Sequence, residues 1–372
     1  MRALLAAITL CFLAGCLDYD KPEASTPAAP QQSPTTQPGA LADSGKLPYA
    51  REAHANEKHF RNIRQLTDGG ENAEAYFSKD GKKLIFQSKR PPYQCDQIFT
   101  MNIDGTNLKL VSTGKGRTTC AYFVYPDDTS VVFSSTHAAM AECPPVPDMS
   151  LGYVWPIYDT YDIYRAKADG SGLQTLGSSP GYDAEATMAP DGSRICFTST
   201  RDGDLDIYTM KPDGSDVVRL TQTVGYDGGP FYSPDGKKIV YRASHPDGPA
   251  LEDYKRLLDR GLIRPTKLDI YMMNADGSNV VRLTDNESAN FCPFFHPDGK
   301  RVIFSSNQGG NKREFDLFSV HIGTKEIEQI TFTGEFDGFP MFSPDGRNLV
   351  WCSNRHNAQD GETNVFIAEW VD

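Results

Sequence analysis

The sequence has no excess of basic residues and, beyond one short N-terminal stretch, no long apolar run. Its 372 residues contain 37 Lys and Arg against 49 Asp and Glu, a formal net charge of −12. Nucleic acids and anionic membrane surfaces attract positive charge, so this balance argues against both as partners. The N-terminal apolar run covers about ten residues, whereas a membrane-spanning helix needs about 20.

The cysteines include no Cys-x-x-Cys pair and no Cys/His spacing typical of zinc. Cys95, Cys120 and Cys143 fall close together around the first two repeats described below. We expect one disulfide among these three, and the spacing leaves the pairing open. The remaining downstream cysteines lie inside strand-like apolar runs and are interpreted as small core residues: Cys196, Cys292 and Cys352.

The N-terminal segment is predicted to be a targeting signal. One Arg precedes the apolar run, which ends in Leu-Ala-Gly-Cys at residues 13–16. This ending resembles the lipobox of bacterial lipoproteins, and the resemblance implies a signal peptide over residues 1–15 and a lipid on Cys16. An ordinary secretory signal that contains a cysteine is the alternative. Leu17 follows, rather than the Asp that retains such proteins at the inner membrane, so we expect an outer-membrane anchor facing the periplasm.

Residues 16–50 are rich in Pro, Ala, Ser, Thr and Gln and have few large apolar side chains. Such a segment cannot bury enough surface to fold, and we predict a disordered tether. A flexible chain of this length spans roughly 30–35 Å on average. The predicted folded domain, residues 51–372, would then lie near the membrane but away from its surface.

Two short phrases recur along the rest of the chain. The first places an apolar run on each side of a turn such as Ser-Pro-Asp-Gly, in which Pro, Asp and Gly each favour a tight turn. It occurs six times, at residues 75–89, 122–136, 187–200, 231–244, 294–307 and 341–355. The second phrase is also strand, turn and strand, and it follows the first five copies at residues 97–112, 162–177, 206–221, 269–284 and 316–331.

Each repeat is therefore predicted to be a four-stranded antiparallel meander of about 44–64 residues, the size of a propeller blade. The sixth unit stops on its third strand, and an orphan strand at residues 60–67 precedes the first unit. Pairing these two segments closes the ring and removes both open edges. The prediction is an all-β, six-bladed propeller in which the N-terminal strand completes the last blade.

These phrases resemble the TolB-type propeller repeat, over about residues 58–372. The resemblance is specific for the fold and not for the function. TolB itself has an additional α/β domain that binds partners, and we expect no counterpart of that domain in this sequence. The resemblance implies a binding role in the cell envelope and makes Ca²⁺ a candidate ion in the channel.

One face of the predicted propeller gathers polar residues around the channel mouth. The residue six positions before each Ser-Pro-Asp-Gly-type turn opens the innermost strand: Asn72, Thr119, Asp183, Asp227, Asn290 and Asp337, with Glu74 and Glu185 two positions further on. A mostly basic ring follows the second strands: Arg90, His137, Arg201, His245, Gln308 and Arg355. These residues either pair with one another to lock the blades or leave oxygens and bases free to bind a ligand.

Two long inserts extend from the same face, at residues 137–161 and 245–267. Long loops in a compact fold are more often functional than idle, so we expect a partial lid over the mouth. We expect Tyr153, Trp155 and Tyr158 to be its exposed contact residues, although the same aromatic rings could serve to pack the insert. The second insert is predicted to contain a short amphipathic helix between Pro249 and Gly261.

Two motifs are rejected. Ser179 sits in a Gly-x-Ser-x-Gly sequence, but Pro180 follows it and no helix is expected there. Asp202, Asp204 and Asp206 are spaced like the start of an EF-hand, but the position of the required Gly holds Ile207. A solvated loop is the better interpretation.

The primary hypothesis is a non-catalytic, lipid-anchored monomer that binds a protein segment or envelope component at its lidded face. The membrane contact would be through the lipid alone, and we expect no nucleic-acid partner. The alternative is a lyase or hydrolase acting on oligosaccharide or peptide through His137, His245 and the acidic ring. We assign no catalytic residue and no certain cofactor.

Overall fold

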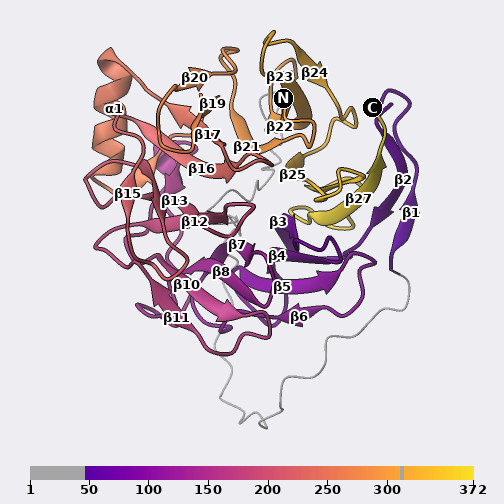
Figure 1. Ribbon diagram of the computed structural model, residues 1–372, viewed down its shortest axis with the longest axis horizontal. Coiled ribbons are helices and arrows are strands. Elements are labelled where there is room, and N and C mark those ends of the chain that lie inside the picture. Colours follow the sequence, from indigo (N-terminus) through magenta and orange to yellow (C-terminus); the bar gives the residue numbers. More distant parts are fainter. Residues whose placement is uncertain (1–46, 311–313) are drawn as a thin grey trace, which may run out of the picture.

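The computed structural model describes residues 47–310 and 314–372. The predicted signal peptide, Cys16 and most of the predicted tether lie outside these residues. Six sheets of the described chain are arranged around a central axis, each with its innermost strand at the axis (Figure 1). This is the predicted six-bladed propeller.

Each of the first five blades is a four-stranded sheet, and its strands follow the chain order from the axis outward. Blade 1 contains β3 (Glu71–Phe77), β4 (Lys83–Lys89), β5 (Gln97–Asn102) and β6 (Lys109–Leu110). Blade 2 contains β7 (Thr118–Val124), β8 (Ser130–Ser135), β10 (Asp162–Lys167) and β11 (Gln174–Leu176). Blade 3 contains β12 (Asp183–Met188), β13 (Ile195–Ser199), β14 (Asp206–Met210) and β15 (Val218–Arg219).

Blade 4 contains β16 (Tyr226–Tyr232), β17 (Lys238–Ser244), β19 (Asp269–Asn274) and β20 (Val281–Arg282). Blade 5 contains β21 (Asn290–Phe295), β22 (Arg301–Ser306), β23 (Asp316–His321) and β24 (Ile327–Gln329). Blade 6 combines both ends of the described chain: β25 (Asp337–Phe342), β26 (Asn348–Ser353) and β27 (Asn364–Trp370), followed by β2 (Phe60–Gln65) and β1 (Tyr49–Arg51).

The ring closes as predicted, because β2 pairs with β27 in the last blade. β1 adds a fifth strand outside β2, which the sequence did not indicate. Buried aromatic residues on the second strands, among them Phe86, Phe197 and Trp351, fill the space between neighbouring blades. Aromatic and β-branched side chains suit such packed sheet faces, since they bury large apolar areas with few rotamers.

The inserts leave the ring on one face. The blade 2 insert contains a short 3₁₀ turn, η1 (Met149–Leu151), and β9 (Trp155–Pro156). The blade 4 insert contains α1 (Gly248–Leu258) and β18 (Leu262–Ile263). The predicted helix is confirmed: Pro249 lies in its first turn, Tyr254 and Leu257 are buried, and Gly261 follows with a φ of 65°.

Candidate functional site

Most residues of the predicted polar ring are buried and paired within their own blades. The pairs join the first residue of the innermost strand to the base that follows the second strand: Arg90 Nη2 to Asn72 Oδ1 at 2.6 Å, Arg201 Nη2 to Asp183 Oδ1 at 2.8 Å, His245 Nε2 to Asp227 Oδ1 at 2.9 Å, and Arg355 Nη2 to Asp337 Oδ2 at 2.8 Å. Charge-assisted bonds of this length hold the first two strands of a blade together.

The three arginines of this ring also stack on aromatic rings of their own blades. Their guanidinium carbons lie 5.0–6.0 Å from the centroids: Arg90 over Phe86 and Phe99, Arg201 over Phe197 and Tyr208, and Arg355 over Trp351 and Phe366. Arg355 additionally pairs with Glu57 at 3.0 Å, which ties the N-terminal segment to blade 6. We call this arrangement the arginine lock. Its guanidinium groups are engaged in structure, and ligand binding by this ring remains a prediction.

Blade 2 departs from the predicted register. Thr118, not Thr119, pairs across from Ser135 and occupies the place that Asn72 has in blade 1. The cause is a longer turn: seven residues separate the paired Phe123 and Val131, whereas six separate Phe77 and Leu84. The assignment of Thr119 to the ring was therefore wrong by one position.

In blade 5 the ring is formed by amides. Asn290 is fully buried, and its side-chain amide donates to the Leu268 carbonyl at 2.8 Å and to Asn286 Oδ1 at 2.8 Å. Asn286 in turn donates to Gln308 Oε1. This blade thus replaces the arginine lock with an uncharged network.

Each innermost strand has a β-bulge whose first residue faces the central cavity. The first residue of each bulge has positive φ: Glu74 (55°), Cys120 (53°), Glu185 (61°), Gly229 (61°), Cys292 (50°) and Phe339 (57°). A left-handed residue in a bulge breaks the alternation of side chains and redirects the strand. All six of these residues line one cavity of about 20 Å³, which is large enough for about one water molecule.

Glu185 and Arg242 form a buried ion pair in this cavity, and their side chains are 4% and 3% exposed. Glu185 Oε2 also accepts hydrogen bonds from Thr198 Oγ1 and the Gly229 amide, both at 2.6 Å. Arg242 Nη2 donates to Tyr226 Oη at 2.6 Å. Burial opposes ionisation of Arg242, but the charge of Glu185 raises its pKa well above its usual value.

Arg242 was missed in the sequence. It stands on β17 where the other second strands carry Gln87, Ser134, Thr198, Ser305 and Cys352. Two features of the sequence could have indicated it: a charged residue inside an apolar run, and two consecutive glycines, Gly228 and Gly229, on the preceding strand β16. A Cβ on Gly229 would lie 2.2 Å from Arg242 Nη1, so glycine at this position makes room for the guanidinium group.

Glu74 faces the same cavity from the opposite side and is 4% exposed. Its carboxyl accepts a weak bond from the Cys120 thiol, at 3.7 Å. Burial, followed by the negative charge of Glu185, raises the pKa of Glu74 to about 8. Glu74 is therefore mostly protonated at neutral pH.

The two inserts join above this cluster. β9 pairs with β18 through Trp155↔Ile263 and Pro156↔Leu262, which makes the predicted lid a single structure. Trp155 is 4% exposed, and its ring centroid lies 5.7 Å from the guanidinium carbon of Arg242 and 5.3 Å from the Phe291 ring. The expectation that Trp155 is exposed was wrong, because its ring packs against Arg242 and Phe291.

The other two lid aromatics are more accessible. Tyr153 is 36% exposed and accepts a hydrogen bond from Trp155 Nε1 at 3.0 Å. Tyr158 is half-buried and donates to the Pro145 carbonyl at 2.5 Å. The two rings therefore support the insert as well as lining its outer surface.

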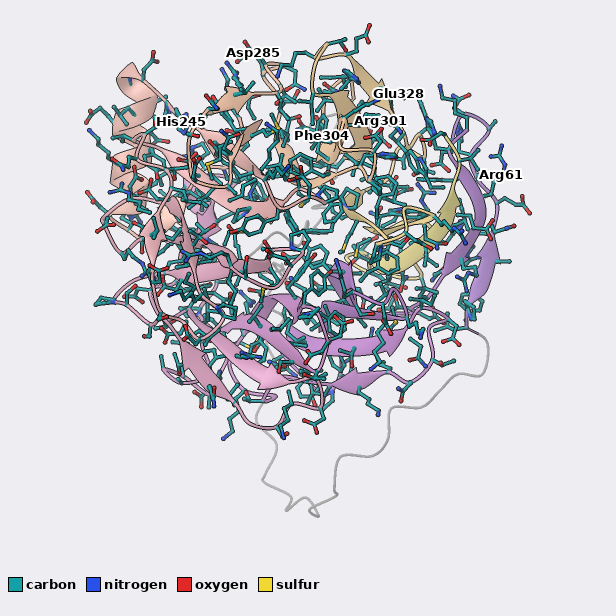
Figure 2. The ribbon with its side chains drawn as sticks, viewed as in Figure 1. Arg61, His245, Asp285, Arg301, Phe304 and Glu328 are labelled. Atoms are coloured by element: carbon teal, nitrogen blue, oxygen red, sulfur yellow. A yellow bond between two sulfur atoms is a disulfide. The ribbon has the colours of Figure 1, made fainter. Side chains whose placement is uncertain are left out.

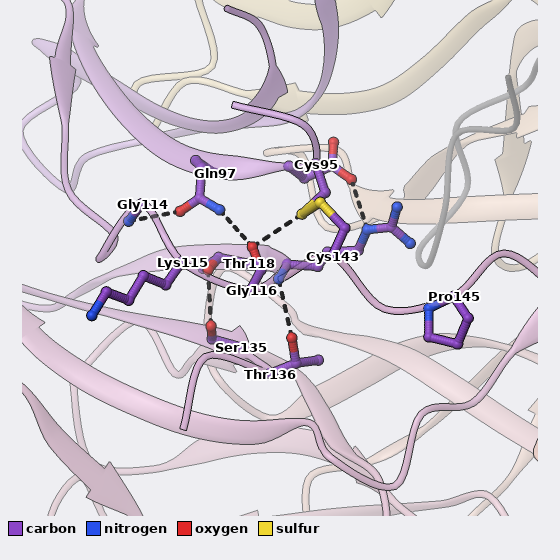
Figure 3. The surroundings of a disulfide bond; sticks show 12 residues. Cys95, Gln97, Gly114, Lys115, Gly116, Thr118, Ser135, Thr136, Cys143 and Pro145 are labelled. Carbon is purple, nitrogen blue, oxygen red and sulfur yellow. Dashed lines mark hydrogen bonds and ion pairs between the residues drawn. A yellow bond between two sulfur atoms is a disulfide. The ribbon is translucent and has the colours of Figure 1, made fainter. Parts of the chain in front are cut away.

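A disulfide fixes the base of the blade 2 insert (Figure 3). Cys95, just before β5, is joined to Cys143, with their Cα atoms 5.9 Å apart. This resolves the pairing that the sequence left open. Cys120, Cys196, Cys292 and Cys352 are free and buried, as expected for the last three.

Two hollows lie beside the joined inserts. The larger, about 730 Å³, lies between the blade 2 insert, the C-terminal end of α1 and blade 3. We call it the insert groove. The smaller, about 390 Å³, lies between α1 and the second and third strands of blade 4, and His245 lines it. We call it the blade 4 cleft.

His137 and His245 occupy the same repeat position but differ in their partners. His137 Nδ1 lies 2.9 Å from Ser135 Oγ, and burial lowers the pKa of its ring. Burial also opposes protonation of His245, but its hydrogen bond to Asp227 and the charge of that carboxylate outweigh this effect and raise the pKa. Only the second histidine therefore has a carboxylate partner.

The rejected motifs have structural roles. The amide and hydroxyl of Ser179 both donate to Asp183, so this serine belongs to a turn. Asp204 accepts from the Gly225 amide and the Tyr254 hydroxyl, and Asp206 accepts from Arg219 and Thr221. Among the described residues, no three His, Cys, Asp or Glu side chains are placed to hold a metal ion.

Within residues 47–310 and 314–372, no helix combines the length and the apolar composition needed to cross a membrane.

Comparison with known families identifies the repeat. The TolB beta propeller domain model matches residues 150–255 and 249–369, which together exceed half of the chain. The chain belongs to the TolB beta propeller domain family.

Curated relatives match over short segments only. Dipeptidyl-peptidase 5 of Porphyromonas gingivalis is 42% identical over 43 residues, or 12% of this chain, and the uncharacterized protein Atu1656 of Agrobacterium fabrum is 33% identical over 69 residues, or 18%. The matches cover 6% and 22% of the lengths of these two relatives. Matches of this length say nothing about the activity of this chain.

Solved structures agree on the fold. A TolB of Agrobacterium tumefaciens superposes with a TM-score of 0.50 and 20% identity, over 82% of this chain and 91% of that one. TolB of Acinetobacter baumannii gives 0.53 and 20%, over 81% and 64%. A gluconolactonase of Xanthomonas campestris gives 0.55 and 12%, over 87% and 95%. At these identities the likeness shows the propeller alone.

Proposed function

We propose that this TolB-family propeller is a lipid-anchored binding module of the cell envelope, which recognises a segment of another envelope protein in the insert groove. The observation that carries the proposal is the groove itself, a hollow of about 730 Å³ built by both inserts on the face that the sequence singled out. Inserts that only covered the channel would not need to form a hollow against the adjacent blade.

The lining of the insert groove indicates the chemistry of the partner. Its apolar part includes Val146, which is 54% exposed, together with Ile157 and Leu258. Its charged part has three carboxylates, from Asp148, Asp159 and Asp259, and one base, from Arg260. Because interfaces match opposite charges, the expected partner segment carries apolar side chains flanked by Lys or Arg.

Photo-crosslinking tests the location of the binding surface. Benzoyl-phenylalanine at Val146 reports on the insert groove, and the same group at Val280, an exposed residue of blade 4 that is 51% exposed, is the matched control. We expect a discrete adduct with an envelope protein from position 146 and none from position 280. Identical adducts from the two positions, or none from position 146, would contradict the proposal.

The anchor has a separate test. Mass spectrometry of the mature protein should find a lipid on Cys16, and Cys16→Ser should move the protein from the membrane fraction to the soluble periplasm. Cys11→Ser, which changes the other cysteine of the same segment, is the control and should leave the fractionation unchanged. If Cys16→Ser fractionates like the wild type, the anchor is wrong while the groove can still stand.

A further inference from the structure

One position of the repeat holds a different residue in the two blades that carry inserts. Blades 1, 3 and 6 use Arg90, Arg201 and Arg355 for the arginine lock. Blades 2 and 4 have His137 and His245 at the equivalent position, each at the point where an insert begins. Histidine is shorter than arginine and leaves space where the lock would stand, and in blade 4 this space is part of the blade 4 cleft.

His245 keeps the bond to the carboxylate of the innermost strand, but it does not fill the space that an arginine side chain would occupy. Its Nε2 lies 2.9 Å from Oδ1 of Asp227, a residue that is 0% exposed. Its ring tilts against Tyr271, with the centroids 5.2 Å apart. Nδ1 has no hydrogen-bond partner in the described part of the chain, and the side chain is 20% exposed where it borders the cleft beside α1 (Figure 2).

The second oxygen of Asp227, Oδ2, is buried and has no hydrogen-bond partner among residues 47–310 and 314–372. A carboxylate in this position holds the imidazole in one orientation, with the proton on the nitrogen between the two groups when the ring is neutral. Nδ1 is then an acceptor toward the cleft. A hydroxyl group is a suitable donor for it.

Most of the charged side chains that line the blade 4 cleft are already paired, and the exposed Asp247 is the exception among the described residues. Arg282 binds Asp269 through both Nε, at 3.1 Å, and Nη2, at 2.5 Å. Arg264 Nε lies 3.1 Å from Asp253 Oδ2. A charged ligand that contacts these pairs would have to break them, whereas hydroxyl groups, which both donate and accept, can bridge them intact.

The size and the remaining lining agree with this chemistry. About 390 Å³ lies within the roughly 300–1,000 Å³ of small-molecule sites. Tyr254 and Tyr271 add aromatic rings to the polar wall. We propose that the blade 4 cleft binds an uncharged, hydroxyl-rich small molecule of the carbohydrate class, with His245 as a hydrogen-bonding residue. This site is independent of the insert groove and does not rest on the proposed protein partner.

The most informative variant replaces His245 by the arginine that stands at this position in blades 1, 3 and 6. His245→Arg should give blade 4 the same arginine lock that blade 3 has. The new arginine should bond to Asp227 and fill the cleft. The full-length protein would be titrated with N-acetylglucosamine as the neutral probe, glucuronic acid as the anionic probe and glucosamine as the cationic probe. We expect the neutral sugar alone to bind, with a Kd of about 1 mM or tighter, and to shift the ring signals of His245 in NMR spectra.

His245→Arg should weaken this binding by about tenfold or more while leaving the unfolding midpoint nearly unchanged. Ala250→Phe, which fills the cleft from the exposed side of α1, is a second variant that leaves Asp227 untouched and should give the same loss. His321→Arg, the same change at the end of β23 outside the cleft, should bind as the wild type does. No neutral-sugar binding, stronger binding of a charged probe, or full binding by both cleft variants would overturn the proposal.

Discussion

Thr67 Oγ1 donates a hydrogen bond to Asn364 Oδ1 at 2.9 Å, although the two residues lie 297 positions apart in the chain. The Thr67 hydroxyl also accepts from the Val365 amide at 2.9 Å. The same clasp joins the third and fourth strands within other blades, as in Thr284 with Asp269 and Thr331 with Asp316. In blade 6 alone among the described blades, it holds together the two ends of the ring.

Thr67→Val removes the clasp hydroxyl and leaves a buried Asn364 oxygen and a buried amide without their partner. We expect a loss of about 1–3 kcal/mol in the free energy of unfolding, measured by urea denaturation. Thr284→Val is the control, because it breaks the same clasp between strands that a hairpin already joins. Hydrogen exchange over residues 60–67 should speed up in the first variant only, and equal exchange in the two would contradict this role.

The raised pKa of Glu74 makes the stability of the propeller depend on pH. The carboxyl titrates near 4.5 when unfolded and at about 8 in the cavity, so between these values the folded state holds a proton that the unfolded state has released. The free energy of unfolding should therefore fall as pH rises from 4.5 to 8, by up to about 1.4 kcal/mol per pH unit.

Glu74→Gln should flatten this pH dependence and stabilise the protein most at pH 8 and above. Urea denaturation at several pH values measures the slope. Glu369→Gln, a change at an exposed residue of β27, should keep the wild-type slope. A wild-type slope in Glu74→Gln would show that the carboxyl is ionised in the folded protein.

The disulfide between Cys95 and Cys143 should stabilise the blade 2 insert. The two residues are 48 positions apart, and closing a loop of this length contributes at most about 4 kcal/mol. Cys143→Ser should lower the thermal midpoint and speed hydrogen exchange over residues 137–161. A reductant should reproduce the effect in the wild type and add nothing in the variant; an additive effect would show that another bond was reduced.

The repeat architecture could be predicted because its signals are local. Turn residues fix each hairpin, and six copies leave little choice of fold; the orphan strand at 60–67 then has one edge to complete. The positions of individual side chains were harder. One extra residue in the turn after Val124 moved Thr119 out of the ring, and no local pattern shows which strand will absorb such an insertion.

The inner channel was the part that sequence reasoning missed. Arg242 and Glu185 meet across two blades, and their pairing depends on the bulges and on space left by Gly229. The burial of Trp155 depends on a two-residue ladder between inserts that are far apart in the chain. Contacts of this kind arise from tertiary packing and leave only weak marks in the sequence.

The central claim is that the joined inserts form a binding surface for an apolar and basic segment. Its most direct test is the yield of the Val146 photo-adduct when Asp259 in the insert groove is changed to Lys. Lysine at the end of α1 suits the helix dipole, so folding should be retained. Glu252→Lys makes the same charge change on an exposed part of α1 outside the groove lining. We predict that Asp259→Lys reduces the adduct about tenfold and that Glu252→Lys leaves it unchanged; equal yields from both variants and the wild type would contradict the account.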